Sequence, residues 1–166
     1  MHIALGYWWY PAGIGYHLER ALSSLGHTVV YVGLPGSQRA GYDNSISLDE
    51  VMAQLSPRPD LYLWIDPANR YFPPRIEDLS ITTACYLVDV HLGHWREQAA
   101  RFFDAIFIAQ HDYVDRFRHA AGHDQVYWLP LAAAPGVHRQ LDRPHIHRRL
   151  DSGARAVHRR RGRDHQ

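Results

Sequence analysis

The sequence contains no lysine, one cysteine and no long hydrophobic run. Because Cys85 is the only thiol, the chain cannot form an internal disulfide, and its apolar surroundings in the sequence fit a buried thiol in a reducing compartment. No apolar stretch approaches the roughly 20 residues that a membrane-spanning helix needs. The apolar start at His2–Leu5 is too short for a secretory signal. We therefore expect a cytoplasmic protein with no membrane span.

Charge is unevenly distributed along the 166 residues, and all 18 basic residues are arginine. Residues 1–136 carry nine Arg and fourteen Asp or Glu, a net charge of −5, whereas residues 137–166 carry nine Arg and three Asp, a net charge of +6. The second segment has few apolar residues, which is typical of a disordered tail or of a frame-shifted end. Arginine-rich tails can bind nucleic acid through phosphates, but no recognition motif accompanies this one, so nucleic acid is not a favoured partner.

Six short apolar segments alternate with amphipathic ones over residues 1–136. They predict strands at residues 2–6, 27–33, 60–65, 82–88, 104–109 and 125–129. Helices are expected at 16–25, 47–55, 94–103 and before Gly122, with one helical turn at 75–79. In the helix at 94–103 we expect Phe102 to face the core and Arg96 to face solvent. This alternation is typical of an α/β fold with a Rossmann-like, doubly wound parallel sheet flanked by helices.

The segment from Thr82 to Trp95 ends a buried strand in polar side chains. Asp89, His91 and His94 follow the apolar run within six residues, and Gly93 allows the chain to turn among them. Ligands of open α/β sheets bind outside the carboxyl ends of the strands, so these side chains are candidates for binding or proton transfer. The alternative is that Asp89 caps the next helix and His91 is a solvated loop residue.

The loop after the first strand combines aromatic residues with glycines. Gly13 and Gly15 would let a phosphate or an acceptor approach the backbone at the start of a helix. Leu18 occupies the position of the third glycine of a dinucleotide-binding loop, so an NAD site is not favoured. The alternative is that the glycines form only a tight turn. Trp8 is a candidate for stacking on a sugar or base, or for contact with a partner domain.

Two further strand ends are polar. Asp66 follows the third predicted strand, where it could bind a ligand or cap the turn that begins at Pro67. Gln110 and His111 follow the fifth predicted strand. Because parallel strands end at one edge of a sheet, we expect these side chains to line the same cleft as Asp89.

Taken together, the strand ends resemble the N-terminal half of GT-B glycosyltransferases, and most closely the CgeB-like, spore-maturation type. The resemblance covers roughly residues 1–138 and includes the first βα unit, with its loop at Gly6–Gly15. Its motifs are Trp64–Pro67 (WIDP), Tyr86–His91 (YLVDVH), Phe107–Tyr113 (FIAQHDY) and Trp128–Ala132 (WLPLA).

The resemblance implies a bilobed enzyme that transfers a sugar from a nucleotide-sugar donor to an acceptor. Residues 1–136 would form the acceptor-binding lobe, with a partner domain at the C-terminal edge of the sheet. The lobe that would bind the nucleotide sugar is absent, so we expect a truncated enzyme half that is inactive alone. No cofactor is expected. Residues 137–166 would be a tail outside this fold.

Roles in the complete enzyme follow from the chemistry of glycosyl transfer, which needs a group to take the proton of the acceptor hydroxyl. His91 is the best candidate for that base, or for a contact to the donor phosphate, and Asp89 would orient it. The other candidates would contact substrate, namely Trp8, Gly13, Gly15, Asp66, Gln110 and His111.

Two other hypotheses remain open at this point. Asp89, His91 and His94, with His111, could ligate zinc or iron, although no fixed metal-binding signature is present. A metal is therefore not expected. The chain could instead be a non-catalytic Rossmann-like binding module whose aromatic loop docks on another chain.

Overall fold

The computed structural model describes residues 1–33, 39, 46–68 and 71–132. Residues 1–131 form one compact unit. The predicted tail at 137–166 lies outside the described residues. The elements, in chain order, are β1 (His2–Tyr7), α1 (Ile14–Ser24), β2 (Thr28–Gly33), α2 (Leu48–Gln54), β3 (Leu61–Ile65), η1 (Ile76–Asp78), β4 (Thr82–Leu87), η2 (Val90–Leu92), α3 (Trp95–Ala100), β5 (Ala105–Ile108), η3 (His111–Tyr113), α4 (Val114–Ala121) and β6 (Val126–Trp128).

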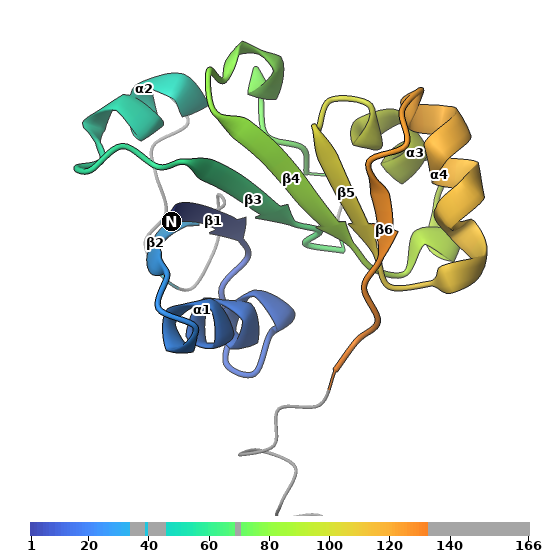
Figure 1. Cartoon of the computed structure of the whole chain (residues 1–166), viewed down its shortest axis with the longest axis horizontal. Helices are drawn as coiled ribbons and strands as arrows, with labels where there is room; N and C mark the ends of the chain where they lie inside the picture. The colour runs from blue at the N-terminus through green and yellow to red at the C-terminus, as the bar shows by residue number, and fades with distance from the viewer. Residues whose placement is uncertain (34–38, 40–45, 69–70, 133–166) are drawn as a thin grey trace, which may run out of the picture. The chain divides into compact units, whose positions relative to one another are not determined.

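Six parallel strands form a single sheet in the order β2-β1-β3-β4-β5-β6 (Figure 1). The pairing register places Leu5 of β1 opposite Tyr31 of β2 and Leu63 of β3. The predicted α/β fold with a parallel sheet is therefore confirmed, and the six predicted strands lie within one or two residues of their observed bounds.

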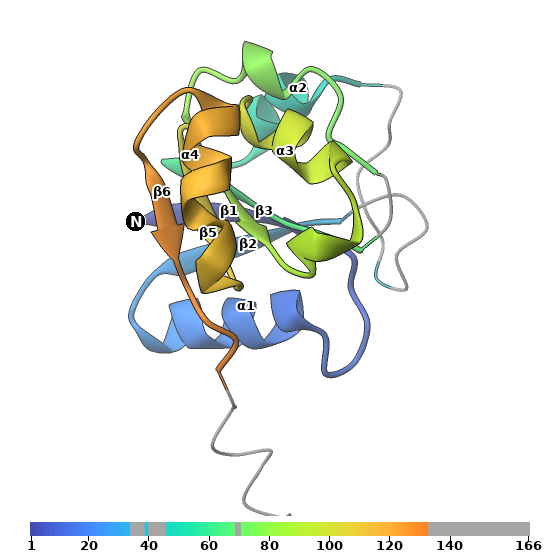
Figure 2. The same ribbon diagram turned by 90° about the vertical axis from the view of Figure 1, so that its right-hand side faces the viewer.

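The helices divide unequally between the two faces of the sheet (Figures 1 and 2). α1 lies on one face, against a cluster that contains Leu5, Tyr86 and Val88. α2, η1, α3 and α4 lie on the other face and share a larger core with Trp64 and Cys85. Right-handed crossovers explain this division, because the chain moves from β1 to β2 in one direction and from β2 to β6 in the other.

Aromatic rings fill the centre of the larger core. Trp64 is fully buried and stacks on Phe103 with 5.7 Å between the ring centroids. Phe72 meets the Trp64 ring edge-on at 5.9 Å, and Trp95 does so at 6.5 Å. The start of α3 is thereby fixed against β3, which positions the residues described below.

Two expectations for the segment at 94–103 are wrong. Arg96 was expected to face solvent but is only 3% exposed, and Phe102 was expected to face the core but is 46% exposed. The helix ends at Ala100, and Phe102 and Phe103 close tighter turns onto Ala99 and Ala100, so the helical phase is not kept to its predicted end. Arg96 is inside because a buried carboxylate bonds its side chain.

Candidate functional site

The strand order reverses between β1 and β3, since the chain first adds β2 on one side of β1 and then β3 on the other. A reversal of this kind opens a crevice at the carboxyl ends of the two strands, where ligands of doubly wound proteins bind. The loops that follow β1, β3 and β4 therefore form the edge at which a site is expected.

Each of these three loops contains a non-glycine residue with a left-handed backbone. Ala12 follows β1 with φ 63°, Ala68 follows β3 with φ 61°, and Asp89 follows β4 with φ 49°. Side chains other than glycine rarely adopt this conformation, and such residues cluster at functional sites. Three of the four described non-glycine residues with positive φ therefore lie in these loops, and the fourth, Arg75, precedes η1.

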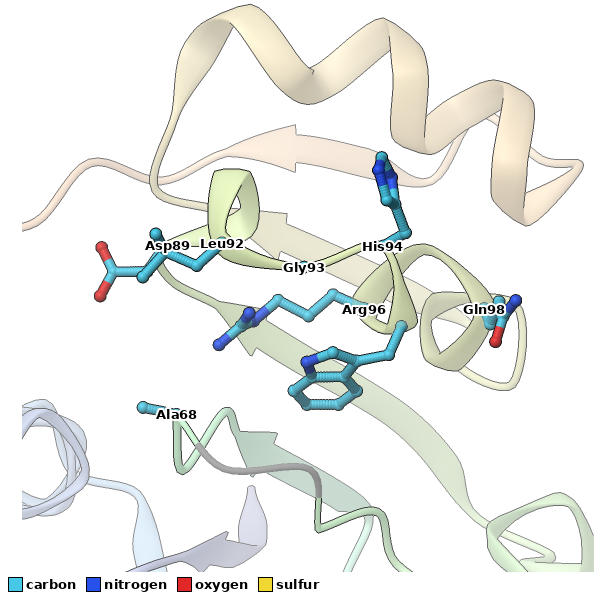
Figure 3. A pocket seen from close by; sticks show the side chains of 8 residues that line it. Ala68, Asp89, Leu92, Gly93, His94, Arg96 and Gln98 are labelled. Carbon is cyan, nitrogen blue, oxygen red and sulfur yellow. The ribbon is translucent and has the colours of Figure 1, made fainter.

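A pocket of about 530 Å³ lies at this edge (Figure 3). It is bounded by the loops after β3 and β4 and by the first residues of α3. Its lining residues are Ala68, Asp89, Leu92, Gly93, His94, Trp95, Arg96 and Gln98.

A buried ion pair forms the base of this region. The Nε–H of Arg96 donates a short hydrogen bond to Oδ2 of Asp66, and the two side chains are 3% and 0% exposed. Asp66 also accepts the backbone N–H of Ala68 at 2.9 Å and a backbone hydrogen bond from Val88. The carboxylate therefore ties the ends of β3 and β4 to α3.

Burial raises the pKa of Asp66 because the charged form loses water, while the hydrogen bond and charge of Arg96 act to lower it. Breaking such a pair by removing one partner leaves an uncompensated buried group, which is strongly destabilising. The ligand-binding role predicted for Asp66 stays a prediction. The turn-capping alternative describes one of its contacts, the bond from Ala68.

Arg96 extends from α3 toward the loops that carry Ala68 and Asp89 (Figure 3). Its guanidinium carbon lies 4.8 Å from the centre of the Trp95 ring, a cation–π contact. Its Nε is bonded to Asp66, whereas its two terminal nitrogens have no hydrogen-bond partner in the part of the chain that the structure describes. The pocket thus contains hydrogen-bond donors that the described residues leave unused.

The three polar residues predicted after β4 differ in position. Asp89 and His94 line the pocket, and His91 is exposed outside its lining. Asp89 precedes η2 but makes no side-chain cap, so the capping alternative is not what the structure shows. The proposed pairing of Asp89 with His91 remains a prediction, since neither a hydrogen bond nor an ion pair joins the two side chains in the described part of the chain.

The exposed ring of His94 is held by two charged neighbours. Its Nδ1 lies 3.2 Å from Oε1 of Glu97 and 2.6 Å from Nη2 of Arg116. The same Arg116 nitrogen lies 2.7 Å from Glu97. This trio joins α3 to α4 on the rim of the pocket.

The aromatic loop after β1 is anchored on both faces of the sheet. Trp8 packs against the larger core, and Trp9 packs against the cluster beside α1. A Cβ on Gly13 would lie 2.9 Å from the Tyr10 ring, and a Cβ on Gly15 would overlap the Tyr7 ring. Close packing of α1 on β1 accounts for Gly15, whereas Gly13 meets only the ring of Tyr10 within the loop, and the substrate role of both glycines remains a prediction.

Gln110 and His111 lie at the end of β5, and neither is among the residues that line the pocket. Oε1 of Gln110 is buried and has no hydrogen-bond partner within the described residues. The ring of His111 is exposed and meets Trp128 edge-on at 5.1 Å. The structure therefore gathers Asp66, Asp89 and His94 around one place and leaves these two residues at a neighbouring strand end.

The described part of the chain has neither a metal-ligand cluster nor a helix suited to a membrane. No group of three or more His, Cys, Asp or Glu side chains there is placed to hold a metal ion. The metal hypothesis for Asp89, His91, His94 and His111 thus gains no support. None of the described helices is both long enough and apolar enough to span a membrane.

Sequence reasoning missed Arg96 and assigned Trp95 only to the core. A helical wheel assigns an arginine to solvent, and the carboxylate that buries this one lies 30 residues earlier, at Asp66. One sequence signal could have indicated this pair. Asp66 directly follows the third predicted strand, and Trp95-Arg96 come shortly after the end of the fourth. No family model matches the chain, and no curated protein matches it.

Proposed function

We propose that this chain is the acceptor-binding lobe of a glycosyltransferase that takes its sugar from a nucleotide donor. The observation that supports the proposal is the pocket at the carboxyl ends of β3 and β4, which Asp89, Trp95 and Arg96 line. Ligands of this fold bind at that edge. The resemblance of the four strand ends to GT-B enzymes supplies the reaction class.

The lining residues fit a polyhydroxylated ligand. Asp89 offers acceptor oxygens, Arg96 and Gln98 offer N–H donors, and half-buried Trp95 offers apolar surface. Aromatic surface with a few placed polar groups is the usual composition of a small-molecule site. A sugar presents both hydroxyls and apolar C–H groups, so it matches this mixture.

Transfer requires that the acceptor hydroxyl lose its proton. His91 remains our candidate for the base. Asp89, which we expect to orient His91, lines the pocket. The His91 ring is exposed and is not among the residues that line the pocket.

The catalytic assignment is tested in a two-lobed enzyme assembled with a donor-binding lobe. Replacing His91 by Ala should lower turnover by about 10²–10⁴-fold, as for loss of a general acid–base group. The matched control is His119→Ala, on α4. Unchanged turnover in the His91 variant would remove this residue from the mechanism.

The binding part of the proposal is tested on the chain itself. Titration with glucose, mannose and N-acetylglucosamine, followed by the indole resonance of Trp95 in NMR spectra, should show saturable shifts. Asp89→Asn should weaken them. Failure of all sugars, neutral or charged, to move that resonance would reject the acceptor-binding role.

A non-catalytic binding module is the second candidate. It is favoured by the exposed apolar side chains at and after β6, since Tyr127, Trp128 and Leu131 are 45%, 53% and 58% exposed. This candidate predicts binding to a partner without affinity for any sugar, so the same titration distinguishes it from the transferase lobe.

A further inference from the structure

We propose that the ligand of this pocket carries an anionic group, a carboxylate or a phosphate, bound by the terminal nitrogens of Arg96. The inference rests on the proposed function only in placing a substrate in the pocket. It adds the class of that substrate, which is a sugar acid or a sugar phosphate in preference to a neutral sugar.

The first support is the state of the guanidinium. Arg96 is 97% buried, and its only hydrogen bond to a described residue uses Nε. The two terminal nitrogens form the edge of a planar fork that matches a carboxylate or phosphate with two parallel N–H···O bonds. Neither nitrogen is among the fully buried, unpartnered polar atoms of the described residues, and Arg96 lines the pocket, so this edge is open to an acceptor group of a ligand.

The second support is the way in which Asp66 is used. Its carboxylate accepts bonds from the Arg96 Nε–H, from the Ala68 N–H and from the backbone of Val88. The negative charge is therefore shared among three donors, and two of them belong to the backbone. The Asp66 carboxylate holds the Arg96 guanidinium in place. The outer edge of the guanidinium, formed by its two terminal nitrogens, still attracts a second anion.

Nearby acidic groups do not take that place. The Asp89 side chain points away from the Arg96 guanidinium (Figure 3). Glu97, one residue further along α3, is bonded to Arg116 at 2.7 Å and lies 3.2 Å from His94. The positive edge of Arg96 is thus the anchor available to a ligand in the pocket.

The size of the pocket decides which anions fit. A cavity of about 530 Å³ is far larger than a single phosphate or carboxylate and falls in the range of small-molecule sites. The anionic group would lie at Arg96, and the remainder of the ligand would extend along Trp95, Gln98 and Asp89.

The experiment compares a neutral sugar with two anionic derivatives of it and with inorganic phosphate. The full chain is titrated with glucose, glucuronate, glucose 6-phosphate and inorganic phosphate, and the NMR shifts of the Trp95 indole and the Arg96 Nε–H are followed. Glucuronate or glucose 6-phosphate should bind at least about tenfold more tightly than glucose, as expected for hydrogen bonds to a charged partner. The preference should shrink as salt is added.

Variants connect the preference to Arg96. Arg96→Gln should abolish this preference. Arg101→Gln is the control because Arg101 is exposed and, within the described residues, its side chain bonds only the carbonyl of Ala120. Since Arg96→Gln leaves Asp66 buried without its partner, the double variant Asp66→Asn with Arg96→Gln is measured beside it. Thermal unfolding shows which of the variants are folded.

Each outcome decides a different point. Equal affinity for glucose and its charged forms would overturn the anion inference and leave the sugar-binding function standing. Phosphate binding that depends on Arg96, without added affinity for glucose 6-phosphate, would support the anion site and reject the sugar ligand. An anion preference that survives in the folded double variant would overturn the assignment to Arg96.

Discussion

At the scale of single residues, close contacts at the carboxyl edge determine what each position tolerates. Gly15 lies where α1 meets the ring of Tyr7, and Tyr7 is 1% exposed. The hydroxyl of Tyr7 donates a 2.5 Å hydrogen bond to Glu19 of the same helix. Tyr7 therefore sets how closely α1 packs on β1, and it limits which side chains can replace Gly15.

Replacing Gly15 by Ala should destabilise the fold by about 1–3 kcal/mol, the usual cost of overpacking. The added Cβ would overlap the Tyr7 ring, and this outweighs the roughly 1 kcal/mol by which Ala is favoured over Gly in a helix. Urea unfolding followed by circular dichroism measures the change. The control is Ser23→Ala on α1, which should change stability by no more than about 0.5 kcal/mol. A more stable Gly15 variant would contradict the close packing.

The pKa of Tyr7 is raised, first by burial and then by its hydrogen bond to Glu19. Folding therefore favours the protonated phenol. Its contribution is complete below about pH 10, the ordinary tyrosine value, and is lost as the pH rises through the raised pKa. Urea unfolding between pH 8 and pH 11 should show a fall in stability that is shallower in Tyr7→Phe. Equal slopes for the two proteins would show that Tyr7 does not carry the effect.

At the scale of elements, α2 shows how local sequence fixes a boundary. Ser47 accepts the N–H of Glu50 at 3.2 Å, and the Glu50 carboxylate accepts the N–H of Ser47 at 2.6 Å, which completes a capping box. Leu48, Val51 and Met52 then face the core on one side of the helix. The capping residues and the spacing of the apolar residues indicate the same start for α2. This agreement made the short helix predictable from the sequence.

Ser47→Ala should cost about 1 kcal/mol of stability at neutral pH, because one orphan N–H of α2 loses its acceptor. The hydrogen bonds with Ser47 lower the pKa of Glu50, so the Glu50 part of the cap is present at neutral pH and is lost as the pH falls through that lowered pKa. The variant keeps the backbone N–H at position 47 but loses the bond between the Ser47 side chain and the Glu50 carboxylate, so the stability difference between variant and parent should narrow in acid. Ser24→Ala, at the end of α1, is the control, and a constant difference across the pH range would argue against the reciprocal cap.

Sequence patterns predicted the six strands and their parallel arrangement because each strand has its own apolar run and its own turn signal. They did not predict Arg96, since a buried ion pair between distant segments has no local period. They did not predict the early end of α3 either. Of the candidate site, the sequence indicated the edge of the sheet and Asp89, while the pocket itself depends on how α3 packs against Trp64.

At the scale of the whole compact unit, one face of the sheet is covered much less than the other. Among the described residues, α1 is the only helix on its face, and it lies beside β1 and β2. Phe107 of β5 and Tyr127 of β6 stack on this side at 5.6 Å, and Tyr127 is 45% exposed. The result is an apolar surface at the β6 end of the sheet.

This surface should bind the dye anilinonaphthalene sulfonate in the native state, because the dye fluoresces on exposed apolar patches. Tyr127→Ser and Leu129→Ser should reduce the native fluorescence while leaving the free energy of unfolding nearly unchanged, since both residues are at least 39% exposed. Leu25→Ser, on the exposed end of α1, is the control. If the β6 variants keep the full signal, the dye binds elsewhere.

Cys85 lies at the centre of β4, is 0% exposed and is the only thiol in the chain. Burial raises its pKa, so the reactive thiolate is suppressed while the sheet is closed. Alkylation must therefore wait for an opening of the middle strands. The rate at which a thiol reagent modifies the native protein thus measures how often the centre of the sheet opens, without any introduced label and independently of which ligand the pocket binds.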